Sequence, residues 1–304
     1  MNIIGRKNWY FGFSLLVIIP GIIAMFLWGL NLSIDFIGGS RLTLSFNNSV
    51  SSKQIQAVNN VLKDEKLKTA SPEKSDKQIF IRTSPMDQSQ NTKFINALAA
   101  QFKDVKEQDF ETIGPVIGQE TTLNALKAVV IASILIILYI TWSFRQVPKP
   151  ASSFRFGVCA IIALIHDVLV VVGIFAILGH FLNVEIDSLF VTAILTVIGF
   201  SVHDTIVVFD RIRENLKKTG GYDFPKTVNE SIIQTIGRSL NTSLTVILIL
   251  IALLLFGGES IHWFVVALLI GVVSGTYSSI FNASPLLVLW HEISSRKKET
   301  KNKN

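Results

Sequence analysis

Two adjacent His-Asp pairs, each inside a long apolar run, are the residues of this chain best suited to chemistry. His203 and Asp204 lie in the stretch from Gly199 to Asn215, which reads Gly-Phe-Ser-Val-His-Asp-Thr-Ile-Val-Val-Phe-Asp-Arg-Ile-Arg-Glu-Asn. The stretch begins in an apolar run of membrane length and ends in a basic segment, so we expect both residues at hydrocarbon depth. An aspartate there costs about 2.5 to 3.5 kcal/mol and faces a bundle interior, a wet cavity or a partner charge. We therefore interpret Asp204 as a protonatable group.

The second pair, His166 and Asp167, lies near the middle of another apolar run. The sequence leaves two roles open for Asp167: a structural hydrogen bond to a neighbouring helix, or the handling of a proton. A third interpretation of both pairs is an intramembrane metal or aspartyl-protease site. Adjacent residues on a helix diverge by about 100°, so neither pair alone forms a ligand cluster, and the usual ligand spacing disfavours this interpretation.

Arg238 is the candidate partner of Asp204. Asn241, Thr242 and Thr245 follow it at i+3, i+4 and i+7, which places all four residues on one helical face. The runs that carry Asp204 and Arg238 cross in opposite directions, so both residues fall in the same half of the bilayer and a pair is geometrically possible. A change in helix spacing would then switch Asp204 between binding and releasing a proton.

Composition places these residues in a membrane protein with several spans. Of the 304 residues, 49% are hydrophobic and only 16% are charged, and the mean hydropathy is +0.48. The single cysteine, Cys159, excludes an intrachain disulfide. The sequence has no Walker A loop, no Gly-x-Ser-x-Gly elbow, no His-Glu-x-x-His and no dinucleotide glycine fingerprint. We therefore expect no enzyme and no cofactor.

Six runs are long enough to cross the roughly 30 Å hydrocarbon core at about 1.5 Å per residue. They are Trp9 to Leu30, Leu123 to Phe144, Phe156 to Leu182, Ser188 to Phe209, Ser239 to Phe256 and Ile261 to Trp290. We expect the first run to be a retained anchor. Sixteen of the 28 lysines and arginines fall on the side of the two termini, and the short loops opposite carry none. By the positive-inside rule, both termini are cytoplasmic.

The segment 31–120 is the only large polar part of the chain, and this orientation makes it extracytoplasmic. It has 11 basic and 11 acidic residues, which argues against nucleic acid as a partner. Its patterns predict strands at Arg41–Phe46, Gln78–Thr83 and Val105–Ile113 and helices at Ser52–Leu67 and Thr92–Phe102.

With a further strand at Lys66–Ala70, the element order would be that of a small ferredoxin-like α+β domain. A folded spacer and a substrate-touching domain both fit this pattern. The predicted organisation is thus 1–30 for the N-terminus and first span, 31–120 for the outer domain, 121–291 for a five-helix bundle and 292–304 for a basic tail.

Two glycine-bearing stretches flank the outer domain. Asp35-Phe36-Ile37-Gly38-Gly39 follows the first span, and Gly114-Pro115-Val116-Ile117-Gly118 precedes the second. Glycines at such places permit a hinge or close packing, and packing is the more common use.

These two stretches, the Gly199 to Asn215 segment and Arg238-Ser239-Leu240-Asn241-Thr242-Ser243 together resemble the SecD/SecF family of protein-export membrane proteins, which are relatives of the RND transporters. The resemblance covers nearly the whole chain. It places the proton-path aspartate of the family on Asp204 and its functional arginine on Arg238. His203 stands where asparagine is common in the family, so it either adds a titrating group or only a hydrogen bond.

The resemblance implies a proton-driven subunit of the bacterial cytoplasmic membrane that helps to draw an unfolded secretory polypeptide across, after the ATP-driven SecA step. It also implies partners: SecD, which would supply the second six-helix half, the SecYEG translocon, and YajC and YidC. Two alternatives remain open. One is half of an RND-type exporter of small molecules or lipids, and the other is a passive scaffold whose buried polar residues only lock helix packing.

Overall fold

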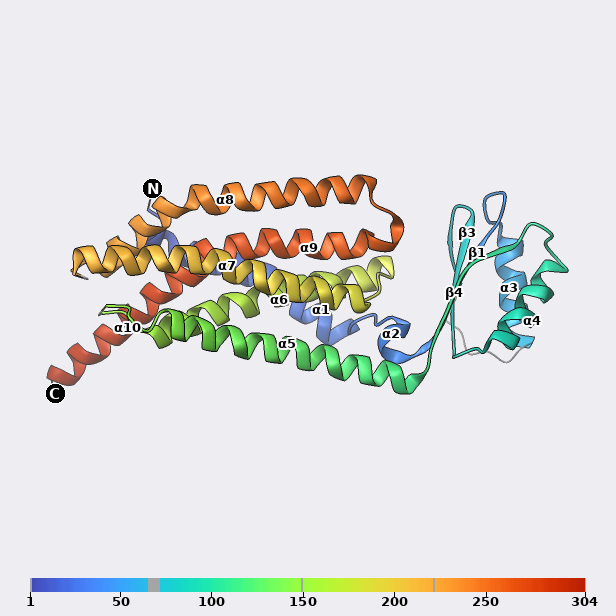
Figure 1. Cartoon of the computed structure of the whole chain (residues 1–304), viewed down its shortest axis with the longest axis horizontal. Coiled ribbons are helices and arrows are strands. Elements are labelled where there is room, and N and C mark those ends of the chain that lie inside the picture. Colours follow the sequence, from blue (N-terminus) through green and yellow to red (C-terminus); the bar gives the residue numbers. More distant parts are fainter. Residues whose placement is uncertain (1, 65–71, 149, 221, 304) are drawn as a thin grey trace. The chain divides into compact units, whose positions relative to one another are not determined.

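The chain folds into a helical unit and a smaller α/β unit, as the computed structural model shows (Figure 1). The structure describes residues 2–64, 72–148, 150–220 and 222–303. The helical unit comprises Met1–Asn31 and Lys127–Asn304, and the α/β unit comprises Leu32–Leu126. The division therefore falls a few residues later in the sequence than the expected end of the outer domain at residue 120.

Among the residues that the structure describes, six helices are long and apolar enough to cross a membrane, which confirms the six predicted spans. The helical elements, in chain order, are η1 (Ile4–Arg6), α1 (Lys7–Trp28), α5 (Pro115–Ser143), α6 (Ser153–Leu182), α7 (Ser188–Thr219), α8 (Phe224–Phe256), α9 (Glu259–Ser278), the π-helical turn η2 (Ser279–Ala283) and α10 (Ser284–Lys303). Helices α7, α8 and α9 pack on one another, and α6 packs on α1, α7 and α9.

Polar residues at the helix ends fix where these helices begin and stop. Asp187 and Asp223 cap α7 and α8 by accepting hydrogen bonds from the backbone N–H groups three residues on, at 2.8 and 3.1 Å. Asn183 after α6 and Gly220 after α7 adopt the left-handed conformation, with φ of 54° and 63°. This conformation ends a helix and suits asparagine and glycine.

Small residues let the helices approach closely. Helices α1 and α6 cross where Gly21 meets Gly173, and a Cβ atom on Gly21 would lie only 2.8 Å from the Cα of Gly173. On α9, a Cβ on Gly271 would lie 2.7 Å from Cγ1 of Val197 in α7, and closer still to its Cγ2. The glycines at these crossings are therefore required by packing.

Two features of the bundle differ from the sequence patterns. The sequence of residues 224–236 looks amphipathic and predicts a segment lying on the cytoplasmic interface, but α8 is continuous from Phe224 to Phe256. Ser231 and Gln234 of α8 bond Asn215 of α7 at 2.9 Å each, so the polar face of this segment packs on α7. The sixth span contains the π-helical turn η2, which ends two residues before Pro285, a residue type that kinks helices.

The α/β unit is a four-stranded antiparallel sheet with two helices on one face (Figure 1). Its elements are α2 (Ile34–Ile37), β1 (Gly39–Ser45), α3 (Ser52–Asp64), β2 (Glu73–Ser75), β3 (Gln78–Thr83), α4 (Gln88–Ala99) and β4 (Lys106–Ile113), and the strand order is β2-β3-β1-β4. In this register Leu42 lies between Ile81 of β3 and Phe110 of β4.

Alternation along the strands builds the core of this unit. Leu42, Leu44, Ile79 and Ile81 are fully buried and pack with apolar residues of α3 and α4, among them Phe94. The opposite face is polar, with an ion pair between Arg41 and Glu111 at 2.7 Å. The expected strand at Lys66–Ala70 lies outside the described residues, and a three-residue strand at Glu73–Ser75 pairs with β3.

Candidate functional site

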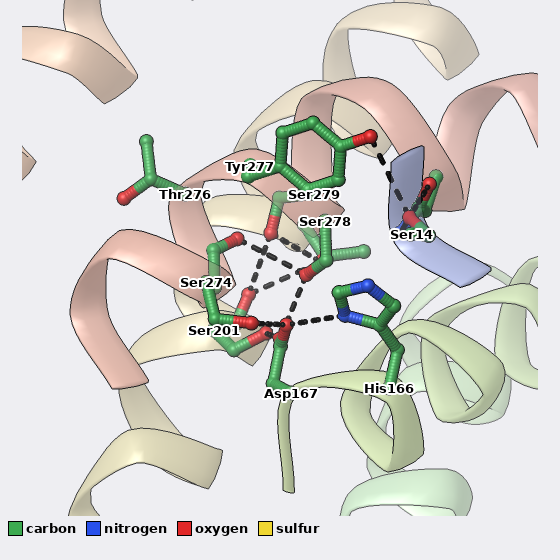
Figure 2. A network of polar contacts seen from close by, with 12 residues as sticks. Ser14, His166, Asp167, Ser201, Ser274, Thr276, Tyr277, Ser278 and Ser279 are labelled. Carbon is green, nitrogen blue, oxygen red and sulfur yellow. Dashed lines mark hydrogen bonds and ion pairs between the residues drawn. The ribbon is translucent and has the colours of Figure 1, made fainter. Parts of the chain in front are cut away.

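Asp167, in the middle of α6, joins three helices through its carboxylate and is only 1% exposed. The hydroxyls of Ser201 on α7 and Ser278 on α9 donate to Oδ2, at 2.6 and 2.7 Å. Oδ1 accepts from the hydroxyl of Ser274 at 2.7 Å and contacts Nδ1 of His166 at 3.0 Å. Figure 2 shows these side chains converging on the carboxylate. Each carboxylate oxygen thus has two polar contacts.

Asp204 is as deeply buried, at 2% exposed, but its surroundings are much less polar. The hydroxyl of Ser243 on α8 donates to its Oδ2 over 3.4 Å, which is at the long limit of a hydrogen bond. The same hydroxyl donates to the carbonyl of Ser239 at 2.9 Å and also contacts Thr276 of α9. Asp204 therefore lies at the contact of α7, α8 and α9 with weak side-chain support.

A chain of hydroxyls runs between the surroundings of the two carboxylates. Ser279, the first residue of η2, donates to the carbonyl of Ser201 at 3.1 Å and contacts the hydroxyl of Thr205 at 2.9 Å. Ser201 bonds Asp167, and Thr205 is the neighbour of Asp204 in sequence. Figure 2 shows Ser279 beside the Asp167 cluster. Ser279 therefore bonds the part of α7 that carries both Ser201, a partner of Asp167, and Asp204.

The other two predicted residues of this site are exposed in the isolated chain. His203 lies on the exposed side of α7, and Arg238 lies on the exposed side of α8. No ion pair joins Asp204 to Arg238 among the described residues, and Ser243 takes the position that the sequence suggested for the arginine. The structure thus brings together neither Asp204 with Arg238 nor Asp204 with Asp167.

The sequence did not identify the serines around Asp167. The spacing of Gly271, Gly275 and Ser278 predicts a seam of small residues that packs helices. The seam does pack, because a Cβ on Gly275 would lie 3.0 Å from Cβ of Ser201. The close approach that these glycines allow also brings Ser274 and Ser278 within reach of Asp167. The available signal was the abundance of serine next to glycine on α9, opposite a buried acid.

The two glycine-bearing stretches that flank the outer domain meet within the α/β unit. Gly38 and Gly39 have φ of 73° and 140°, in the region that favours glycine. A Cβ on Gly38 would lie 2.8 Å from Cα of Pro115, and one on Gly118 would lie 2.9 Å from the carbonyl oxygen of Phe36. Around Gly114 there is open space. The turn that contains Asp35 and Phe36 is therefore packed directly against the start of α5.

Among the described residues, no group of three or more His, Cys, Asp and Glu side chains could hold a metal ion. The site instead consists of two buried carboxylates, one histidine and a set of hydroxyls, which can bind and pass protons. The fold and site therefore define a membrane protein of six helices with an α/β domain inserted after the first helix and ionisable groups buried in its bundle.

Comparison with known proteins places this class more narrowly. Residues 93–293 match the family model "Protein export membrane protein SecD/SecF, C-terminal", and residues 23–50 match the "SecD/SecF GG Motif". The chain belongs to the SecD/SecF family.

Individual proteins that are similar to this chain support its membership of the family. The chain is 48% identical to "Protein translocase subunit SecF" of Thermobaculum terrenum over 93% of this chain and 92% of that protein. It is 35% identical to "Protein translocase subunit SecDF" of Bacillus subtilis over 94% of this chain. The crystal structure of SecDF from Thermus thermophilus, a translocon-associated membrane protein, superposes with a TM-score of 0.82, 33% identity and 95% of this chain covered. The chain spans 37% and 38% of the lengths of these two SecDF proteins.

Proposed function

We propose that this chain is an accessory subunit of the Sec translocase that uses the proton motive force to promote protein translocation across the bacterial cytoplasmic membrane. The observation that carries the proposal is Asp204, a carboxylate 2% exposed within a membrane-length helix of a chain that belongs to the SecD/SecF family. Its function is movement of protons and polypeptide, with no covalent catalysis.

Asp204, Arg238, His203 and Asp167 are the proposed proton-coupling residues. Asp204 is held by a long hydrogen bond, so a small change in the packing of α7 and α8 alters its contacts. Proton uptake neutralises it, and approach of Arg238 in another state of the bundle favours release. Moving one charge through 100 mV supplies about 2.3 kcal/mol, which is enough to shift a two-state equilibrium.

Exposed polar residues of α7 support SecD as the partner that completes the bundle. Thr192, Thr196, Gly199 and His203 recur at spacings of 4, 3 and 4 and form an exposed stripe. Arg238 and Asn241 of α8 are also exposed. The hydroxyls of Thr192 and Thr196 bond carbonyls of their own helix. Lipid does not satisfy His203, Arg238 and Asn241, so a second six-helix half covers them. The SecDF relatives, in which this chain matches little more than a third of the length, agree with this arrangement.

We further propose SecYEG, YajC and YidC as neighbours, and both termini in the cytoplasm. The α/β unit then lies on the outer side of the membrane. The strand order β2-β3-β1-β4 and the two crossover helices support a ferredoxin-like domain. There it contacts the emerging unfolded polypeptide. Site-specific crosslinking from the polar sheet face at Arg41 to a stalled secretory chain tests this role, and the absence of crosslinks contradicts it.

Replacement of Asp204 by asparagine tests the proposed function. The variant is expected to assemble with SecD and to lose the part of export that depends on the proton gradient, measured in membrane vesicles with and without an uncoupler. The matched control is Asp223→Asn, because Asp223 is exposed and asparagine caps a helix equally well. Full export by an assembled D204N complex would show that Asp204 only packs the bundle.

A further inference from the structure

We propose that His166 and Asp167 form a second proton-binding site, separate from Asp204, in which Asp167 stays ionised and the imidazole of His166 takes up and releases the proton. The inference rests on the proposed function, because a second proton site serves this chain only if protons move through it during transport.

The contacts of Asp167 fit an ionised carboxylate. Two hydroxyls donate to Oδ2, and Oδ1 accepts from Ser274 and contacts Nδ1 of His166. An ionised carboxylate only accepts hydrogen bonds, whereas a protonated one must also donate. All three serine contacts are 2.6 or 2.7 Å long, as expected for a hydroxyl that donates to a charged oxygen. The site is therefore built to hold a negative charge.

The three serine hydroxyls and Nδ1 of His166 stabilise the buried carboxylate while the ring is neutral, and the protonated ring adds a counter-ion 3.0 Å from Oδ1. The neighbouring elements bring Tyr277 from α9, 6.2 Å from the imidazole between ring centroids, and Tyr10 from α1, whose carbonyl accepts from the Tyr277 hydroxyl. From α7 comes Asp204, and none of these three is a cation. Arg155 lies 12 residues earlier on α6, about 18 Å along the helix, over the Trp290 ring of α10.

The second ring nitrogen of His166 is the point at which a proton can enter and leave. His166 is 9% exposed, and its Nε2 has no hydrogen-bond partner among the described residues. In Figure 2 this nitrogen lies on the edge of the ring turned away from Asp167, on the side of Ser14 and Tyr277. Ser14 in turn bonds Asn282 of η2 and contacts the Tyr277 hydroxyl. Nδ1 of His166 thus bonds Asp167, whereas Nε2 faces the side of Ser14 and Tyr277 without a hydrogen bond to either.

The proton step involves one site on the ring. The neutral imidazole has its hydrogen on Nδ1, which donates to Asp167, and a proton then binds to the free electron pair of Nε2. The product is an imidazolium paired with the carboxylate, and release reverses the step with no other bond changed. Ser201, which bonds Asp167, lies one turn before Asp204 on α7.

Nuclear magnetic resonance of the full chain in lipid bilayers, labelled with ¹³C and ¹⁵N only at histidine, tests the proposal. The chain has five histidines, and the nitrogen shifts separate imidazolium from neutral imidazole. We expect the nitrogen shifts of one buried imidazole to pass from the imidazolium to the neutral values as the pH is raised, because the proposal gives His166 the exchangeable proton. This signal disappears in His166→Asn, and in Asp167→Asn the same imidazole stays neutral throughout.

The control is His262→Asn, because His262 is exposed and its loss leaves the signal unchanged. If H166N does not fold, removal of the other four histidines one at a time assigns the signal by elimination. A His166 that stays neutral throughout, or an infrared carbonyl band of a protonated acid that is lost in D167N, overturns the proposal. These spectra do not depend on export. They can therefore refute the proton site at His166 even when D204N abolishes export, and they can support this site even when D204N exports normally.

Discussion

The contact between α7 and α9 at Gly271 allows a sharp test of the bundle packing. In Gly271→Ala, the new Cβ would lie 2.7 Å from Cγ1 of Val197 and closer still to Cγ2, and Val197 is 1% exposed. Neither side chain can move away without displacing its neighbours. Overpacking of this kind costs about 1 to 3 kcal/mol. Alanine in place of glycine also favours a helix by roughly 1 kcal/mol, so the net change is smaller than the clash.

Gly237→Ala is the matched control for the gain in helix propensity. Gly237 is also inside a helix, but a Cβ there meets no atom within 4 Å. Both variants gain the same helix propensity, so the difference in stability between them isolates the clash. We expect G271A to be less stable than G237A by about 1 to 3 kcal/mol. Val197→Ala makes room for the new methyl group, so the cost of G271A should shrink in that background by about 0.5 to 3 kcal/mol.

The chain contains its own probe for the measurement. Cys159 is the single cysteine and is 1% exposed, so a fluorogenic thiol reagent labels it only when the bundle opens. Thermal unfolding in detergent, followed by this labelling, gives the midpoint for each variant. Equal midpoints for G271A and G237A would refute the close approach of α7 and α9, because no clash would then exist at this position.

Two further predictions concern the buried carboxylate and the glycine turn. Ser278→Ala removes one of the hydrogen bonds to Asp167, so the Cys159 assay should show a free energy of unfolding lower by about 1.5 to 3 kcal/mol. The control is Ser294→Ala, which removes a hydroxyl bonded only to a backbone carbonyl and should change stability little. Equal losses in the two variants would contradict the role of Ser278. Gly38→Ala forces alanine to a φ of 73° and places its Cβ 2.8 Å from Pro115. It should destabilise the α/β unit by at least about 1 to 3 kcal/mol, measured as faster limited proteolysis of this unit, whereas Gly114→Ala, with open space around it, should resist the protease like the unchanged chain.

Much of the fold could be predicted from the sequence because the patterns that specify it are local. The length and hydropathy of each run predict the six helices, and the alternation in Arg41–Phe46 and Gln78–Thr83 predicts two central strands. The extent of α8 was missed because its first part looks amphipathic on its own. Its polar face is satisfied by Asn215 of α7, which no pattern within α8 reveals.

The candidate site was predictable only in part, for a related reason. A carboxylate in an apolar run is conspicuous, so Asp167 and Asp204 were both found. Their partners come from other helices, and the spacing within α9 does not tell which neighbour Ser274 and Ser278 face. The suggested pairing of Asp204 with Arg238 relied on depth in the bilayer alone, whereas the rotation of α8 about its axis places Ser243 inward and Arg238 outward.

The meeting of Gly21 with Gly173 limits how the first helix can move against α6. With no side chain between the two backbones, the helices cannot come closer, and any separation would leave a void that lipid tails cannot enter. Sliding along the axis would bring the bulkier neighbours of each glycine into collision. A change of crossing angle about this point remains, and it would have to break the stacking of Trp28 on His180, whose ring centroids are 4.1 Å apart.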